Sequence, residues 1–476
     1  MAGKNIGHGT PKNEMGGWKA FKRWEWQWEQ RVYPDGNFPS SSHIFNEKTK
    51  WKNRKDNKEK LQEVNSWVSL GPYTSPGGYA GLGRLNWIEE DPNYNGTTNT
   101  TIWVGSPSGG LWKSTDDGST WTSKFDNFNC LGVSSIAIQP DTTSIMYIAT
   151  GDGDASDTYS IGVLKSTDGG ETWNTTGLNW STSNTRTIRK IIMSPTDFKT
   201  LFAATSIGIF RTTNSGNSWS QLNSGTYYDI EFKPGNPTTL YASSATTIIR
   251  STNNGSNWTT LTNGLPTTNL RRTELAVSPA DTNVVYALYG YSGGNNNNGF
   301  YGVYKTTNAG DNWTAVYTYD GGGLNLLGWN SNGSDAGGQA WYDLVLACSP
   351  TDINEIYVGG VNIWRSTNGG SSWSIVAHWT GTGAAAVHAD HHYLGFAKST
   401  NRLYNGNDGG IYRSTNKGSN WSWLGNGLNI TQYYRLGASK TNSARIIAGS
   451  QDNGTKLLKS GTWSDAIGGD GMECLD

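Results

Sequence analysis

The sequence predicts an all-β protein, a multi-bladed β-propeller built from at least eight four-stranded blade units. One observation is composition: 23 Trp, 23 Tyr and 62 Gly in 476 residues suit aromatic-packed strands joined by tight turns. Another is an octapeptide that recurs seven times at intervals of 39 to 60 residues, a spacing typical of four-stranded blades. Because an isolated blade exposes both sheet faces, the units are expected to stack around an axis.

Each octapeptide has the pattern Ser/Thr-Thr-Asp/Asn-x-Gly-x-x-Trp. It reads as the turn of a hairpin, in which the Asp or Asn side chain accepts from turn amides and the Gly takes a positive φ. The Trp is expected to cover the hairpin from inside, equivalently buried in all seven repeats. These residues are Trp121, Trp173, Trp219, Trp258, Trp313, Trp373 and Trp421.

The segments before each octapeptide repeat as well. A short strand ending in a base comes directly before it, a β-rich segment such as IMYIAT lies earlier, and an alternating strand such as SSIAIQP comes first. Each unit therefore reads as strands A, B and C, the octapeptide turn, and strand D. The units open near Arg84, Val133, Ile188, Tyr228, Arg272, Tyr342, His392 and Tyr433, and only the eighth lacks an octapeptide. A ninth unit begins near Gly471, so we expect the propeller of residues 66–476 to be incomplete at its C-terminus.

Residues 1–65 differ from the repeats and are interpreted as an N-terminal arm. In WKAFKRWEWQWEQRV, the aromatic residues fall near one face of a 3.6-residue period, which predicts a short amphipathic helix containing Trp24 and Trp28. Membrane binding would require the basic residues to be grouped opposite the aromatic face. In this segment Glu25 and Glu29 interrupt the basic residues. We therefore expect the arm to pack on the propeller or on a partner protein.

Composition excludes several classes of partner and site. The net charge of −1 gives no general attraction to nucleic acid. No apolar run reaches the roughly 20 residues of a membrane-spanning helix, and MAGKNIGHGT lacks the apolar core of a signal peptide. We expect a leader to be absent from the numbering. Cys130, Cys348 and Cys474 are too scattered for a disulfide framework or zinc ribbon and are expected to be buried as small hydrophobic residues.

The repeats resemble a known family of propellers. Together with GSPSGGLWKSTDDGSTW, GNDGGIYRSTNKGSNW and GSQDNGT, the octapeptides resemble the BNR/Asp-box propellers, especially the sortilin-like (VPS10-type) branch of secreted bacterial proteins, over about residues 66–476. The segment FKRWEWQWEQRV looks like the leader-proximal part of bacterial surface proteins exported by the type IX system. The resemblance implies an extracellular or cell-surface location and contact with secretion or surface-anchoring machinery. Sortilins also carry a cysteine-rich module, which three scattered cysteines do not match.

The candidate binding residues lie in the B–C loops and the D–A connections, on the face opposite the octapeptide turns. These loops are the longest and richest in aromatic and acidic residues, which is typical of functional loops on a repeat scaffold. We expect an extended polysaccharide or protein segment to bind there, with rings stacking and carboxylates accepting hydrogen bonds. The candidates are Trp329, Trp341, Tyr342, His388, Asp390, His392, Asp408 and Asp452.

Two parts of this face could hold a divalent ion, a zinc-like or similar ion at the first and Ca²⁺ at the second. His388, Asp390 and His392 alternate in HADHH, so an extended strand would place all three side chains on one side. The acidic loop GDGDASD contains Asp152, Asp154 and Asp157, which could bind Ca²⁺ together with backbone carbonyls. Histidines satisfied by protein neighbours and Asx-turn hydrogen bonds are the alternative interpretations.

An enzymatic alternative is a glycoside hydrolase similar to the family 74 xyloglucan hydrolases, which share the Asp-box. It would need two carboxylates about 5 to 9.5 Å apart across a cleft, and Asp390, Asp408, Asp452 and Asp470 are the candidates. The family's catalytic motifs and the sialidase arginine triad are not matched, and no GxSxG elbow is present. Because the boxes indicate a fold and not an activity, the sequence favours binding without catalysis.

Overall fold

The computed structural model describes residue 50, residues 69–75 and residues 80–471 apart from 127, 129, 398, 399 and 443. This part of the chain is almost entirely β, and the predicted all-β propeller fold with eight blade units is confirmed. The predicted helix around Trp24 and Trp28 and the third cysteine, Cys474, lie outside the described residues. Within them, no helix is long and apolar enough to cross a membrane, and Cys130 and Cys348 are free thiols.

The strands form eight sheets, each with its strands in chain order. The first sheet contains β1 (Trp87–Glu90), β2 (Ile102–Ser106), β3 (Gly110–Ser114) and β4 (Thr122–Ser123). The second contains β5 (Val133–Ile138), β6 (Met146–Thr150), β7 (Gly162–Ser166) and β8 (Asn174–Asn179). The third contains β9 (Ile188–Met193), β10 (Leu201–Thr205), β11 (Gly208–Thr212) and β12 (Ser220–Ser224), after a 3₁₀ turn at Thr182–Asn184. The fourth contains β13 (Asp229–Lys233), β14 (Asn236–Ser243), β15 (Ile248–Ser251) and β16 (Thr259–Leu261).

The fifth sheet contains β17 (Leu270–Val277), β18 (Val285–Tyr291), β19 (Phe300–Thr306) and β20 (Thr314–Thr318). The sixth contains β21 (Val345–Cys348), β22 (Ile356–Gly359), β23 (Ile363–Ser366) and β24 (Ser374–His378), with a short parallel fifth strand, β25 (Ala385–Ala386). The seventh contains β26 (His391–Phe396), β27 (Leu403–Asn407), β28 (Gly410–Ser414) and β29 (Ser422–Trp423). The eighth contains β30 (Tyr433–Ala438), β31 (Arg445–Ser450), β32 (Thr455–Lys459) and β33 (Thr462–Ile467).

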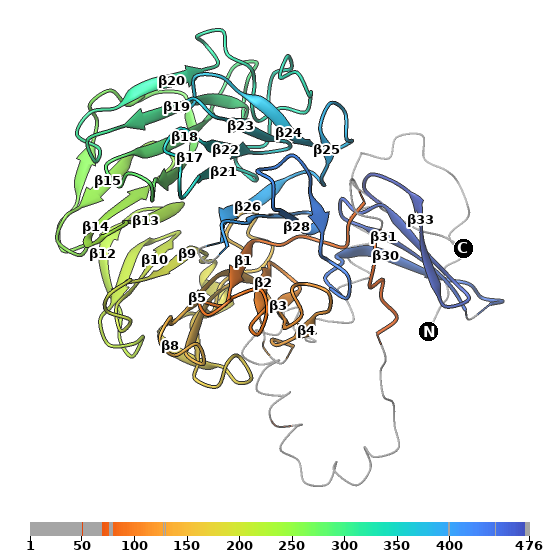
Figure 1. Cartoon of the computed structure of the whole chain (residues 1–476). Coiled ribbons are helices and arrows are strands. Elements are labelled where there is room, and N and C mark those ends of the chain that lie inside the picture. Colours follow the sequence, from red (N-terminus) through yellow and green to blue (C-terminus); the bar gives the residue numbers. More distant parts are fainter. Residues whose placement is uncertain are drawn as a thin grey trace, which may run out of the picture. The chain divides into compact units, whose positions relative to one another are not determined.

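Seven of the eight sheets close the ring (Figure 1). The segment before β1 runs along the seventh sheet, where the amides of Leu82 and Leu85 donate to the carbonyls of Gly409 and Asn407, both at 3.1 Å. One apolar cluster continues from the first sheet into the seventh, with Ile88 and Ile411 both buried in it. This packing occupies the gap between the first and seventh blades, so β30–β33 lie beside the ring (Figure 1).

The octapeptide turns have one hydrogen-bond pattern in all seven blades. In the first, the amide of Gly118 donates to Oγ of Ser114 at 2.9 Å, and Asp116 accepts from the amide of Thr120 at 2.8 Å. The Gly takes a positive φ as predicted, 85° for Gly118. The residue before it is also left-handed, for example Asp117 with φ of 60°, which the sequence pattern did not predict.

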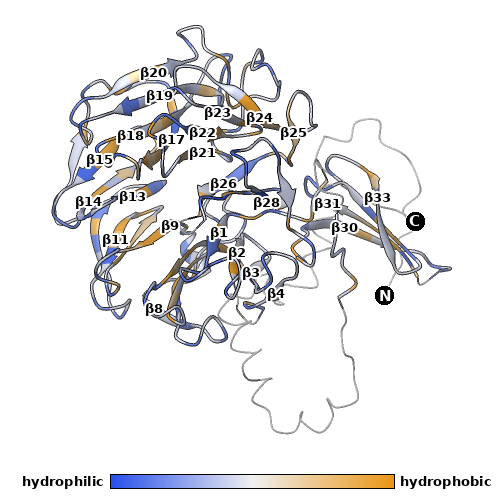
Figure 2. Ribbon diagram, viewed as in Figure 1, coloured by the Kyte–Doolittle hydropathy of each residue, from blue (hydrophilic) through white to orange (hydrophobic). Residues whose placement is uncertain are grey.

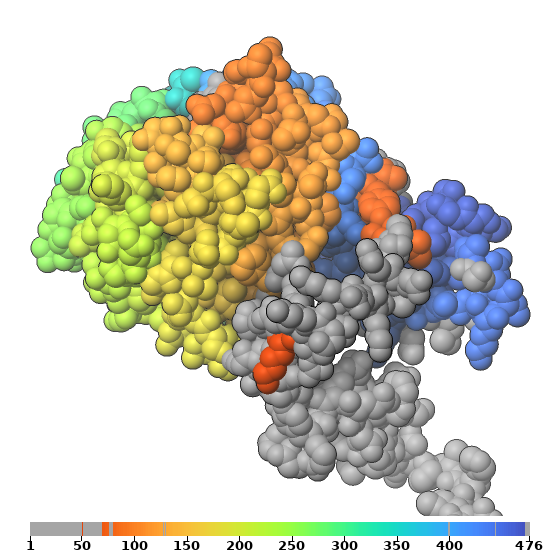
Figure 3. Space-filling model, turned by 90° about the horizontal axis from the view of Figure 1, so that it is seen from below, coloured from red at the N-terminus to blue at the C-terminus, as the bar shows by residue number. Residues whose placement is uncertain are grey.

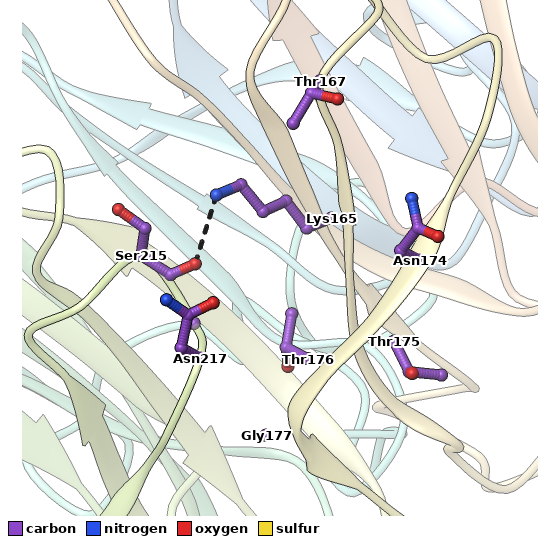
Figure 4. Close-up of a pocket in the computed structure, with 9 residues that line it drawn as sticks. Lys165, Thr167, Asn174, Thr175, Thr176, Gly177, Ser215 and Asn217 are labelled. Carbon is purple, nitrogen blue, oxygen red and sulfur yellow. Dashed lines mark hydrogen bonds between the residues drawn. The ribbon is translucent and has the colours of Figure 1, made fainter.

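That left-handed residue connects neighbouring blades. Its carbonyl faces the preceding blade, where Lys165 donates to Ser215 at 3.4 Å (Figure 4) and Arg250 donates to Ala309 at 2.7 Å. In the second, third, fourth and seventh blades, the base that ends the C strand therefore contacts the next blade. At the closure of the ring, Arg413 of the seventh blade donates to Asp117 of the first at 2.6 Å. The octapeptides thus act as structural joints between blades.

The core lies between the blades, where apolar side chains of neighbouring sheets are buried in shared clusters. Figure 2 shows hydrophobic stretches mainly along the strands. Figure 3 shows the first and second blades in direct contact, and Leu111 and Ile136 are buried in one cluster between them. The expected equal burial of the seven octapeptide Trp residues is only partly correct. Trp121, Trp173, Trp313 and Trp373 are buried, whereas Trp219, Trp258 and Trp421 are half-buried.

Candidate functional site

The predicted site residues come from the loops at one face of the ring. In an antiparallel four-stranded blade, the B–C turn and the D–A connection lie at the same end, opposite the octapeptide. Asp152, Asp154 and Asp157 belong to the β6–β7 loop, while the long β20–β21 connection contains Trp329 and Trp341. Tyr342 lies in the same connection, His392 is the second residue of β26, and the loops of the sixth, seventh and eighth sheets supply the remaining candidates.

A buried network centred on His392 joins several of these loops. Its Nδ1 lies 3.0 Å from Oδ2 of Asp154, and its Nε2 lies 3.0 Å from Oδ1 of Asp408. Tyr342 donates to the other oxygen of Asp408 at 2.7 Å and packs edge-on against the imidazole ring. Burial alone would lower the pKa of His392, but the two carboxylates raise it to about 9. His392 is thus a cation that crosslinks two loops.

Asp408 carries the negative charge of this network. Its side chain is buried, which opposes ionisation, yet hydrogen bonding and the charges of His392 and Arg84 hold its pKa well below the ordinary value. Arg84 in turn donates to the hydroxyl of Tyr342 at 2.9 Å. Both carboxylate oxygens of Asp408 therefore already accept a hydrogen bond from a buried donor.

The acidic β6–β7 loop is neutralised by arginines from other blades. Asp152 accepts from Arg84 at 2.5 Å, and Asp154 lies 3.0 Å from Arg272 and 3.3 Å from Arg189. Asp152 also accepts from the amides of Asp154, Ala155 and Asp157. These backbone contacts are the Asx-turn hydrogen bonds that were the alternative to a metal site. The carboxylates of Asp152 and Asp154 also face guanidinium groups. The calcium site predicted for this loop thus has no geometric support here.

Three carboxylates converge beside the network. One oxygen each from Asp390, Asp408 and Asp452 can be chosen so that all three lie within 4.8 Å of one another. Burial, followed by the charge of Asp408, raises the pKa of Asp390 to about 7. The pKa of Asp452 is raised to about 8 by burial and by Asp408. Asp470, the fourth predicted acid, instead accepts from the backbone amide of Asp452 at 2.9 Å.

A fourth acid next to this trio escaped the sequence analysis. Asp343 is 1% exposed, and its carboxyl group lies within hydrogen-bonding reach of that of Asp390. Burial and the neighbouring charge of Asp390 raise its pKa well above the ordinary value. Only its place after Tyr342 in the long connection could have indicated it. Arg84 and Arg272 could have been predicted as residues of this site, because both stand at predicted starts of blade units.

The expected alternation in HADHH is not what the structure shows. Asp390 has a left-handed φ of 63°, and β26 begins only at His391. As a result, Nε2 of His388 donates to the carbonyl of Asp452 at 3.1 Å, while both nitrogens of His392 face carboxylates. The ion site expected from His388, Asp390 and His392 is therefore not assembled in this form.

Exposed tryptophans lie in the connections that precede the sixth and seventh sheets. Trp329 and Trp341 are 41% and 42% exposed, as expected for binding residues, and Trp379, which the sequence analysis did not select, is 38% exposed. Trp379 donates to the carbonyl of Trp329 at 3.3 Å, and Asp335 accepts from the amide of Trp329 at 2.6 Å. Tyr342 was also predicted to contact ligand, but it is buried between Arg84 and Asp408.

No family model and no curated protein sequence matches the chain. Among solved structures, an ancestral GH74 enzyme aligns with a TM-score of 0.60 and 18% identity, covering 83% of this chain and 55% of that one. The GH74 xyloglucanase of Xanthomonas campestris gives 0.57 and 16%, covering 80% and 60%. The Niastella koreensis GH74 enzyme gives 0.54 and 16%, covering 84% and 69%. At such identities the likeness establishes the propeller fold alone, and the chain spans little more than half the length of the first of these proteins.

Proposed function

We propose that the chain binds an extended polysaccharide across the loop face that carries Trp329, Trp341 and Trp379. The observation that carries the proposal is the exposure of three indole rings on loops that hydrogen bonds hold in place. Exposed aromatic rings offer flat apolar faces to the C–H surfaces of sugars at little entropic cost. Asp390 and Asp452 lie at the same face and would accept hydrogen bonds from sugar hydroxyls.

Binding without cleavage is favoured by the state of Asp408. A glycosidase nucleophile or base must reach the sugar or a water molecule, whereas Asp408 is 3% exposed and bonded to His392 and Tyr342. An inverting enzyme also needs carboxylates about 6.5–9.5 Å apart to admit a water. The trio here offers oxygens within 4.8 Å of one another, which is closer than that arrangement and near the spacing of about 5–5.5 Å in retaining enzymes. The burial of Asp408 is therefore the stronger argument against cleavage.

A glycoside hydrolase is the second candidate, and one specific observation favours it. Asp390 and Asp452 have pKa values raised to about 7 and about 8, while the pKa of Asp408 is lowered. Carboxyl groups whose pKa values are pushed apart are the usual acid and base of such enzymes. In that case Asp452, the most accessible of the three, would protonate the leaving oxygen.

The proposal includes a location outside the cell or at its surface. It rests on the resemblance of the octapeptide repeats and of FKRWEWQWEQRV to secreted bacterial propellers, and it extends to contact with secretion or surface-anchoring machinery. Accessibility of the native protein to protease added to intact cells tests it. Cleavage only after cell lysis would contradict a surface location.

The binding proposal is tested with soluble polysaccharides in affinity electrophoresis, after a glycan array has identified the ligand. Trp329→Ala and Trp341→Ala are expected to weaken binding by about tenfold each, since a lost aromatic contact costs about 1–1.5 kcal/mol. Trp258→Ala is the matched control. It removes a half-buried Trp of the opposite face, so it is expected to lower stability and leave binding unchanged.

Two results would overturn the proposal. One is that no polysaccharide is retained, or that a protein segment is retained instead. The other is that Trp329→Ala and Trp341→Ala bind as well as the unmodified chain, since the exposed rings would then have another role.

A further inference from the structure

The eighth sheet, which lies beside the ring (Figure 1), contacts the ring through its β31–β32 turn. In this turn Asn453 donates to the carbonyl of Asp408 at 2.9 Å, and the carbonyl of Asp452 accepts from His388 at 3.1 Å. The outer strands of the sheet are little covered: all of β30 except Gly437 and all of β33 except one residue are exposed. The contacts of this turn therefore decide in large part how firmly the eighth sheet is held.

Two carboxyl groups meet where the turn contacts the ring. Asp452 belongs to the β31–β32 turn and Asp408 to the β27–β28 turn of the seventh sheet, and each offers an oxygen within 4.8 Å of the other's. Their side chains are hydrogen-bonded to each other. Ionised carboxylates only accept hydrogen bonds, so one of the two groups carries a proton. A carboxylic acid that donates to a carboxylate forms a strong, charge-assisted bond.

The proton belongs to Asp452. Asp408 accepts from His392 at 3.0 Å and from the hydroxyl of Tyr342 at 2.7 Å, and these contacts stabilise its ionised form. Asp452 has no ion pair with a lysine or arginine among the described residues, and burial together with Asp408 raises its pKa to about 8. Asp452 is therefore the donor and Asp408 the acceptor of the bond between the turns.

The other titratable groups around Asp452 do not replace this proton. They come from the connection before β26, from β30 and from the segment after β33: His388, Asp390, Tyr434 and Asp470. Asp390 and Asp470 are acids whose charges also raise the pKa of Asp452. Burial lowers the pKa of His388 and raises that of Tyr434, so both are neutral at pH 7. Lys456 of β32 donates instead to Asp465 and to the carbonyl of Gly81.

We propose that the pair Asp408–Asp452 is a pH-sensitive latch between the ring and the eighth sheet. The latch is closed while Asp452 carries its proton and donates it to Asp408. When Asp452 ionises, this bond is lost and two carboxylates repel each other across the joint. The eighth sheet is then released from the ring at the β31–β32 turn. This inference does not depend on polysaccharide binding by the loop face.

The direction of the pH effect follows from the two states of the turn. In the released sheet Asp452 faces water and has its ordinary pKa of 3.8, whereas against the ring the value is about 8. Between these values the closed state holds one proton more than the open state. The closed state is therefore disfavoured by up to about tenfold for each unit of rising pH, and the effect ends above about pH 8.

Hydrogen exchange of the full chain, measured by mass spectrometry on peptides from β31 and β32, tests the latch. After correction for the intrinsic exchange rate, protection of these strands should fall by at least about tenfold between pH 6 and pH 8.5. Peptides from β10 in the third sheet serve as the reference, because this strand is buried throughout. They should remain protected at both pH values.

Two substitutions of Asp452 separate the latch from a general loss of stability. Asp452→Asn supplies a permanent donor to Asp408, so protection at pH 6 and pH 8.5 should agree within about twofold. Asp452→Ala removes the charge and the donor together, which should give the same independence of pH at a lower level of protection. Asp465→Asn is the control, because Asp465 lies in the same sheet but is bonded to Lys456. It should retain the pH effect.

Two results would overturn the latch. One is equal protection of β31 and β32 in the unmodified chain at both pH values. The other is a full pH effect that persists in both Asp452→Asn and Asp452→Ala, since a group other than Asp452 would then be responsible. Comparing the two pH values within each variant keeps the test valid even where a substitution lowers protection overall.

Discussion

At the level of single residues, the interior of the loop face is held by ionised groups whose partners come from distant blades. Arg84 precedes the first blade, Asp152 lies in the second, and Tyr342 precedes the sixth. Such groups stabilise a structure only when every charge has a partner, since an unpaired buried charge costs several kcal/mol. Individual substitutions here should therefore be costly even where they leave the ligand surface intact.

Tyr342→Phe is the sharpest test of this network. The substitution keeps the ring against His392 but removes the hydroxyl that donates to Asp408 and accepts from Arg84. A loss of about 1–3 kcal/mol in the free energy of unfolding is expected for a buried, charge-assisted pair. Denaturant unfolding measures it, and polysaccharide binding should not change, because Tyr342 is buried. An unchanged stability would show that the network does not support the fold.

Glu274 gives a prediction of pH dependence. Burial raises its pKa to about 8, despite Arg272 at 3.6 Å, from an ordinary value of 4.5. Between pH 4.5 and 8 the folded chain therefore holds one proton more than the unfolded chain, so the free energy of unfolding falls as the pH rises through this range. Glu274→Gln should reduce the stability difference between pH 5 and pH 8 by about 1 kcal/mol or more. Equal slopes for both proteins in urea titrations would contradict this.

At the level of elements, the octapeptide turns explain how blades are joined. Each turn has a left-handed residue. In several blades that residue accepts a hydrogen bond from the base that ends the preceding blade's C strand or from a tyrosine of its B strand. The turn was predictable, because the Asp or Asn, the Gly and the Trp are all local to eight residues. The contact between blades was not predictable, because it depends on which blade packs beside the turn in the folded protein.

Asp117 forms the joint that closes the ring, so its replacement should have a distinct effect. It accepts from Arg402, Arg413 and the hydroxyl of Tyr94. Asp117→Ala leaves two cations without their partner and should lower the melting temperature by several degrees, which corresponds to about 1–3 kcal/mol. Asp311→Ala is the control: it removes a more exposed ion pair with Arg250, worth about 0–1 kcal/mol. Equal effects of the two substitutions would argue against a special role for ring closure.

At the level of the whole molecule, the sequence predicted the architecture but not the number of blades that close the ring. The eight units and their strand order follow from repeats that are visible along the chain. Closure after seven depends on the packing of Leu82, Leu85 and Ile88 against the seventh sheet, residues that stand more than 300 positions away from it. No local sequence pattern indicates a contact between segments that lie so far apart in the chain.

The same distinction applies to the site. Asp390, Asp408 and Asp452 were predicted as candidates, because they stand in loops that break the regularity of the repeat. Their roles could not be predicted, because these depend on partners in other blades, such as His392 for Asp408 and His388 for Asp452. Tyr342 was expected at the ligand surface and is buried instead, since sequence does not show which aromatic residue of a loop turns inward.

The central claim is that the loop face holds a polysaccharide and does not cleave it. The most direct test incubates the full chain, with and without Ca²⁺, with the polysaccharide that it binds most tightly and then quantifies new reducing ends. We expect no release above that of the heat-denatured chain, while binding persists throughout the incubation. Steady release that is abolished by Asp408→Asn or Asp452→Asn, in variants that remain folded, would contradict the claim and identify the protein as a glycoside hydrolase.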